Sequence, residues 1–181
     1  MTIPPFLNTG LLPIGTYSVT FSELRQSHLV AGSGNGDDWD IDWRTRLAAN
    51  AEILVSQLWQ VGISEVFLDG SFTEAKPHPN DIDGYFECDA KSFAQGLVAQ
   101  QLNATDPHKV WTWAHSARRP APGSMKRQLP MWHRYRVELY PHFPGLLSGI
   151  VDPWGNELQF PSAFRQQRGT GFRKGIIRII P

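Results

Sequence analysis

Residues 65–87, EVFLDGSFTEAKPHPNDIDGYFE, decide the fold of this chain. Their first part, 65–69, is a short run of β-forming residues that stops at Gly70, which predicts a strand followed by a turn. A proline-containing turn then leads to 81–87, which predicts a second strand. The stretch therefore predicts two neighbouring strands with a Gly-Ser bend after the first and acidic residues at the start of the second.

Two carboxylates of the second strand carry the candidate chemistry. Alternate residues of a strand face the same side, so Asp81 and Asp83 are expected to project together while Ile82 points into the core. Adjacent carboxylates repel each other unless a cation lies between them. Hard oxygen ligands suit Mg²⁺ or Mn²⁺. The pair therefore predicts a metal site.

A third strand is predicted over 134–140, where the residues alternate strictly up to Pro141. Glu138 would share one face of this strand with Arg136 and Tyr140. If the strand lies beside 81–87, Glu138 completes a three-carboxylate cluster that can hold two metal ions. In the alternative, Glu138 is a strand-surface residue paired with a neighbouring arginine. The weaker substitutes for its role are Glu87 and Asp152.

Helical periodicity appears on both sides of the first two strands. Apolar residues recur at helical spacing between Asp42 and Trp59, with Gly62 just past the end and Asp40 or Asp42 as the cap. The other predicted elements are an N-terminal arm and flexible loop over 1–41, a short helix after Thr20 within it, a helix over 91–102, and a strand over 175–180.

The bulk composition is that of an ordinary folded protein, with 41% hydrophobic and 19% charged residues. The formal net charge is zero, so any nucleic-acid argument must rest on local charge. Cys88 is the only cysteine, which fits a reducing compartment. No signal peptide and no run of 18 apolar residues is present. We therefore expect a cytoplasmic protein that does not enter a membrane.

Two motifs of the chain resemble a known superfamily. Leu68-Asp69-Gly70-Ser71-Phe72, followed by Asn80-Asp81-Ile82-Asp83-Gly84, is similar to the Gly-Ser and Asp-x-Asp signature of the DNA polymerase β-like nucleotidyltransferases. Within that superfamily, the chain looks closest to an uncharacterised bacterial and phage family of compact nucleotidyltransferase-like proteins. The resemblance covers most of the chain, but only residues 61–87 are specific.

The resemblance implies an α+β protein with the minimal nucleotidyltransferase fold, a mixed β-sheet flanked by helices, as a single domain over 1–181. It implies that Gly70 and Ser71 contact nucleotide phosphates, and that Asp81 and Asp83 bind Mg²⁺ or Mn²⁺. Glu138 would stand where the superfamily has its third carboxylate. The segment 84–137 is longer than one helix needs, which departs from the family pattern.

A basic and aromatic insert is predicted over 105–133, which is irregular. Residues 106–136 hold seven basic residues against one acid, Asp106, with Trp and His interleaved. Such a segment suits a nucleoside triphosphate or single-stranded nucleic acid, and Lys126 and Arg136 are expected to bind the nucleotide. The alternative is a solvated flap whose tryptophans close the core. The tail from 162 is also basic, and it either adds positive potential near a phosphate or pairs with the acidic 37–42 loop.

A second Gly-Ser and Asp-x-Asp pair, at residues 32–33 and 40–42, has nearly the same spacing. No hydrophobic strand precedes this copy, so the pair at residues 70–71 and 81–83 is preferred.

The leading hypothesis is an enzyme that transfers a nucleoside monophosphate from an NTP to an RNA, protein or small-molecule hydroxyl, with release of pyrophosphate. Its rivals are a non-catalytic nucleotide- or nucleic-acid-binding module of a toxin–antitoxin or phage-defence pair, which has a partner protein, and a plain interaction scaffold.

Overall fold

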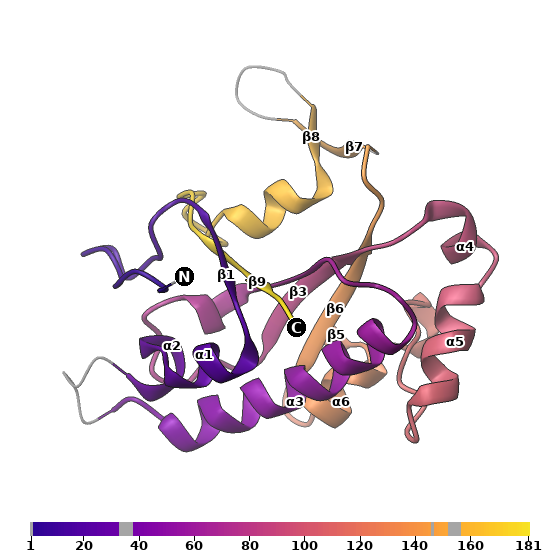
Figure 1. Ribbon diagram of the computed structural model, residues 1–181, viewed down its shortest axis with the longest axis horizontal. Helices are drawn as coiled ribbons and strands as arrows, with labels where there is room; N and C mark the ends of the chain where they lie inside the picture. The colour runs from indigo at the N-terminus through magenta and orange to yellow at the C-terminus, as the bar shows by residue number, and fades with distance from the viewer. Residues whose placement is uncertain (1, 33–37, 146, 152–156) are drawn as a thin grey trace.

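The computed structural model describes residues 2–32, 38–145, 147–151 and 157–181. Its main sheet has five strands in the order β1-β9-β2-β3-β6 (Figure 1). These strands are β1 (Thr16–Val19), β2 (Val66–Asp69), β3 (Ile82–Glu87), β6 (Val137–His142) and β9 (Ile176–Ile179).

The sheet is mixed. β2 runs antiparallel to both of its neighbours, β3 and β9. β3 is parallel to β6, and β1 is parallel to β9. The predicted α+β class, with a mixed sheet flanked by helices, is therefore confirmed at this level.

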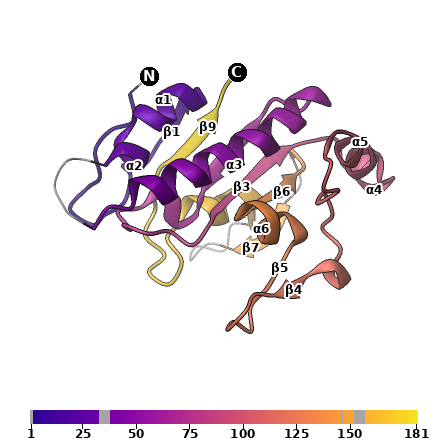
Figure 2. The same ribbon diagram turned by 90° about the horizontal axis from the view of Figure 1, so that it is seen from below.

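Helices cover one face of the sheet, and Figure 2 shows α3 crossing that face. Thr20 caps the predicted short helix with a capping box, in which its hydroxyl and backbone exchange hydrogen bonds with Glu23. Asp40 caps α3 by accepting from the Trp43 N–H. The helices are α1 (Phe21–Gln26), α2 (His28–Ala31), α3 (Ile41–Gln60), α4 (Ala90–Ala94), α5 (Leu97–Thr105) and α6 (Pro130–Tyr135).

The predicted helix over 91–102 is divided in two. Gly96 adopts φ +76° between α4 and α5, a backbone conformation that interrupts an α-helix. The predicted flexible loop within 31–38 lies mostly outside the described residues.

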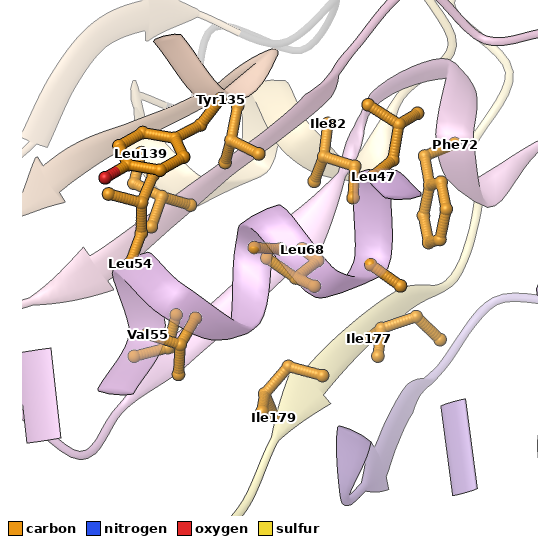
Figure 3. Close-up of a cluster of buried hydrophobic side chains, with 14 of the residues drawn as sticks. Leu47, Leu54, Val55, Leu68, Phe72, Ile82, Tyr135, Leu139, Ile177 and Ile179 are labelled. Atoms are coloured by element: carbon orange, nitrogen blue, oxygen red, sulfur yellow. The ribbon is translucent and has the colours of Figure 1, made fainter. Parts of the chain in front are cut away.

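The main core lies between the helices and the face of the main sheet that they cover (Figure 3). Leu47 and Leu54 of α3 pack with Leu68 of β2, Ile82 of β3 and Ile177 of β9, and all five are fully buried. Full burial of each such side chain contributes about 1.5–3 kcal/mol. The core residues alternate along each strand, so the residues between them face the opposite side.

The opposite face carries a smaller apolar cluster of Phe67, Tyr85 and Ile176, with Phe164 packed against it. Phe164 belongs to the 3₁₀ helix η3 (Phe160–Arg165), which follows the two-stranded sheet of β7 (Leu147–Val151) and β8 (Glu157–Gln159). These elements lie on the other side of the main sheet from α3 (Figure 1). The polar residues of this second face form the candidate site.

The third predicted strand begins later than expected. Residues 134 and 135 end the helix α6, which has Pro130 at its first position, and β6 starts only at Val137. Arg136 joins the two in the left-handed region, at φ +57°. Proline at the first helical position starts a helix without losing a hydrogen bond. The strand prediction was therefore wrong for 134–136 and right for 137–140.

Candidate active site

Three carboxylates form a row across three neighbouring strands. The strand register places Asp69 of β2 opposite Asp83 of β3, and Asp83 opposite Glu138 of β6. Directly opposed residues share one face of a sheet, so all three point away from the main core. Asp69 and Glu138 are 4% and 2% exposed, which makes the row a concentration of buried negative charge.

The row opens into a cleft of about 640 Å³, within the range of small-molecule sites. Of the residues expected from the sequence, the lining includes Gly70, Ser71, Asp81, Asp83, Lys126 and Glu138. Arg136 is not among the lining residues. It instead stacks its guanidinium over the Trp132 ring, with the carbon 3.9 Å from the ring centroid.

The Gly-Ser bend is the short 3₁₀ helix η1 (Gly70–Thr73), directly after β2. Gly70 has φ +77°, and a Cβ atom there would lie 2.8 Å from Asp83 Oδ2 and 3.2 Å from the Asp83 nitrogen. Only glycine satisfies both conditions without strain. The bend is therefore held against the carboxylate row.

Lys174 holds the Gly70-Ser71 bend in place through buried contacts. Its ammonium is 1% exposed and donates to Gly70 O at 2.9 Å and Glu74 Oε1 at 2.7 Å, and it lies 3.1 Å from Asp69 Oδ1. Thr73 also donates its hydroxyl to Asp69 at 3.1 Å. Burial nevertheless raises the Asp69 pKa to about 6, because desolvation outweighs the attraction of the lysine.

A buried arginine holds the loop that follows the bend. Arg44 of α3 donates from one guanidinium nitrogen to Phe72 O at 2.9 Å and from the other to Lys76 O at 2.6 Å. It also stacks on Trp39 and donates to Leu29 O. The chain between β2 and β3 is thus tied to the helical layer.

Asp83 lies at the centre of the row. Burial, together with the neighbouring charges of Asp81, Glu138 and Asp69, raises its pKa to about 7, while Lys126 opposes that rise. Within the described part of the chain, no hydrogen bond reaches its carboxylate. A carboxylate in this position has unused lone pairs and excess negative charge around it, which is the donor chemistry that a hard divalent cation fits.

Protein donors engage one oxygen of Asp81 and both oxygens of Glu138. Asp81 Oδ2 accepts from the Trp132 indole at 2.7 Å. Glu138 accepts from the Leu129 N–H at 2.6 Å and from the Tyr140 hydroxyl at 2.7 Å.

The open alternative for Glu138, a surface pair with Arg134 or Arg136, does not match its burial. Its nearest arginine is Arg118, at 3.9 Å.

No group of three or more His, Cys, Asp or Glu side chains among the described residues is arranged to hold a metal ion. Mg²⁺ is commonly held by one or two carboxylates together with substrate phosphates. Asp83 with Asp81 is such a pair, so the donor set fits an open site for a hard divalent cation rather than a closed protein cage.

The substitutes considered for the third carboxylate lie elsewhere. Glu87 is at the far end of β3, opposite His142. Asp152 lies outside the described residues. In the second motif copy, Asp40 caps α3 and Asp42 occupies its first turn, while Ser33 is outside the described residues. That copy therefore forms a helix start.

In the insert, the tryptophans and the cations lie in different places. Its tryptophans close the core: Trp111 is fully buried and donates to Gln57, and Trp113 donates to Leu139 O. Lys126, by contrast, is exposed and lines the cleft. In the tail, Lys174 pairs with Asp69 and Glu74, and Arg178 pairs with Glu65, so neither of these two cations pairs with the 37–42 loop.

Sequence reasoning missed Asp69 and Lys174 as site residues. Asp69 was not among the expected site residues, although its position at the end of the predicted strand, directly before Gly70, was a usable signal. Lys174 carries no local signal, since it stands in a basic, glycine-flanked segment typical of an exposed turn.

The described residues include no helix that is long and apolar enough to cross a membrane. The chain belongs to DUF6932, a family of unknown function, whose model matches residues 4–180. No curated protein and no solved structure matches the chain.

Proposed function

We propose that this protein is a metal-dependent nucleotidyltransferase of the minimal DNA polymerase β-like type, which moves a nucleoside monophosphate from an NTP to an acceptor hydroxyl. One observation carries the proposal: the carboxylates of Asp69, Asp83 and Glu138 form one row beside the Gly70-Ser71 bend, in a cleft of about 640 Å³. The resemblance of the motif order and spacing to that superfamily also supports it.

In this proposal Asp83 and Asp81 hold the Mg²⁺ or Mn²⁺ ion. When bound, the metal neutralises triphosphate charge and lowers the pKa of the acceptor hydroxyl. The Gly70-Ser71 bend donates hydrogen bonds to the phosphates, because a glycine lets backbone approach them closely. Lys126 adds positive charge at the same cleft.

The transfer itself forms one bond and breaks another. The acceptor oxygen attacks the α-phosphorus, the bond from that phosphorus to the bridging oxygen breaks, and pyrophosphate leaves with the electron pair. Glu138 accepts the hydroxyl proton. Its carboxylate is oriented by Leu129 and Tyr140, so little reorganisation is needed as charge develops.

The test is to incubate the purified protein with labelled NTPs, Mg²⁺, and total cellular RNA and protein, and to follow label transfer and pyrophosphate release. We expect Asp83→Asn to abolish both while the thermal unfolding transition is retained. Asp42→Asn is the matched control, because Asp42 is an exposed member of the rejected motif copy. Equal labelling by wild type and Asp83→Asn would remove the proposal.

One observation favours a second candidate, a nucleotide-sensing module of a toxin–antitoxin or phage-defence pair. Asp81 and Glu138 already bind protein donors, and such contacts also suit a site that binds without turnover. This candidate predicts heat on titration of an NTP with Mg²⁺, and no pyrophosphate. Calorimetry together with the labelling assay therefore separates the transferase from the nucleotide-sensing module. If no NTP produces heat, an interaction scaffold is favoured.

A further inference from the structure

The surface of the insert is positively charged. No acidic residue occurs between Asp106 and Glu138, and these two flanking acids are each 2% exposed. Asp106 is turned inward, where it accepts from the Val110 N–H and the Tyr135 hydroxyl. The solvent-facing side of this segment therefore carries cations without exposed carboxylates, on a chain whose formal net charge is zero.

Part of this surface is a structured hairpin. We call residues 118–128 the basic hairpin; it contains β4 (Arg119–Pro120) paired antiparallel with β5 (Arg127–Gln128). Arg118 donates to Arg127 O at 3.3 Å, and Arg127 donates from Nε to Arg118 O at 3.2 Å. In Figure 2 the hairpin extends away from the sheet and the helices.

The cations of the basic hairpin are available to a ligand. Arg119, Lys126 and Arg127 are exposed, and no ion pair joins any of them to a carboxylate in the described part of the chain. Arg118 and Lys126 also line the cleft that holds Asp83. Positive charge is therefore continuous from the hairpin into the candidate active site.

The basic hairpin lacks the groups that a protein partner or a base-stacking site needs. The tryptophans of the insert point inward, as Trp111, Trp113 and Trp132 donate to partners in the core or the cleft. The one large exposed apolar side chain described in the hairpin is Met125. Protein interfaces have apolar and aromatic centres, whereas nucleic-acid interfaces are polar and positive.

We propose that the basic hairpin binds the sugar-phosphate backbone of a nucleic acid strand, and thereby makes a nucleic acid the acceptor for transfer at the cleft. The assignment of the strand as acceptor rests on the proposed function. The binding of the strand to the basic hairpin does not rest on it. Arginine and lysine contact the phosphodiesters, so binding is independent of base sequence and falls with salt. The strand end that carries the hydroxyl enters the cleft along Arg118 and Lys126.

The test measures binding without catalysis. Fluorescence anisotropy with labelled 20-nucleotide single strands of RNA and of DNA, each in two unrelated sequences, is recorded in EDTA without NTP over a range of salt. The variant Arg119→Gln/Arg127→Gln is compared with Arg46→Gln/Lys91→Gln, which removes the same charge from exposed sites on α3 and α4. Arg119→Lys/Arg127→Lys keeps the hairpin charge.

Each phosphate contact to a single strand contributes about 0.7 to the slope of log affinity against log salt. Loss of two contacts should therefore reduce the slope by about 1.4 and the affinity about 25-fold at 0.1 M salt. The control and the lysine variant should bind like wild type, and both sequences should bind alike. The RNA and DNA arms identify the strand type.

The proposal is overturned if wild type binds neither strand, if the control loses as much affinity as the hairpin variant, or if a poly-glutamate peptide competes as well as RNA does. Asp83→Asn should bind the strand normally. A protein that binds nucleic acid through the hairpin but transfers no label would refute the proposed function and leave the hairpin assignment intact.

Discussion

Replacement of Lys174 by methionine tests how the site is held together. The substitution keeps the length of the side chain and removes the cation that Asp69 and Glu74 share. Removing one partner of a buried ion pair costs about 3–5 kcal/mol. For a chain of this size each kcal/mol lowers the melting temperature by about 2–4 °C, so we expect a fall of about 6–20 °C at pH 8.

The loss should depend on pH, because Asp69 can be neutralised. Its folded-state pKa is about 6, above the ordinary value of 3.8, so the folded state binds the proton more tightly than the unfolded state. Stability contributed by this proton is present at low pH and is lost as pH rises through about 6. Without Lys174 the pKa rises further. The destabilisation should therefore be smaller at pH 5 than at pH 8.

Thermal unfolding followed by circular dichroism in EDTA, at pH 5 and pH 8, measures this difference. The double variant Asp69→Asn/Lys174→Met should recover part of the loss at pH 8, since it removes a negative charge left without its partner. Lys91→Met, on the exposed surface of α4, should have little effect. Equal destabilisation at both pH values, or none at pH 8, would refute the reasoning.

Three further predictions concern single residues of the site and its support. Gly70→Ala should lower the free energy of unfolding by about 1–2 kcal/mol, because alanine is strained at positive φ. It should also abolish the heat of nucleotide titration, because the added Cβ displaces Asp83. An unchanged free energy of unfolding together with unchanged nucleotide binding would contradict this. Arg44→Met should lower the free energy of unfolding in urea by about 3 kcal/mol, since several buried carbonyls lose their donor; a wild-type urea midpoint would count against it. Asp83→Asn should raise the melting temperature in EDTA, because it relieves charge repulsion. Mg²⁺ with an NTP should stabilise the wild type only. If Mg²⁺ with an NTP also stabilised the variant, the metal would bind elsewhere.

Local signals in the sequence were sufficient for the helices α1 and α3 and for the two motif strands. The capping box at Thr20 and the long apolar periodicity that ends at Gly62 each involve residues a few positions apart. The same is true of the Gly-Ser bend, where a glycine after a buried strand indicates a tight turn. Interactions of this range are encoded in the segment itself, so they can be predicted without the rest of the chain.

The sheet order could not be predicted in the same way. β1 and β9 pair although they come from opposite ends of the described chain, and no local pattern specifies that partner. Residues 134–140 alternate as a strand does, but Pro130 starts a helix that continues to Tyr135. Here a start signal several residues upstream outweighed the local alternation.

Three acidic residues of the candidate site were expected from the sequence, whereas Asp69 and its partner Lys174 were not. Asp81, Asp83 and Glu138 follow from motif spacing and strand alternation. The burial of Lys174 depends on Asp69 and Glu74, which lie about a hundred residues earlier in the chain, and a basic segment gives no indication of such partners. Long-range ion pairs of this kind are set by the assembled sheet.

The position of β9 between β1 and β2 has a consequence for how the molecule forms. The antiparallel pair of β2 and β3 can assemble early, because the two strands are close in sequence, but β2 then has an open edge until β9 arrives from much later in the chain. Pairings of such long range are slow to close, and an open strand edge can pair with another molecule. Nascent chains should therefore need protection from aggregation until synthesis has passed β9, and Lys174, only two residues before that strand, would join Asp69 at the same late stage.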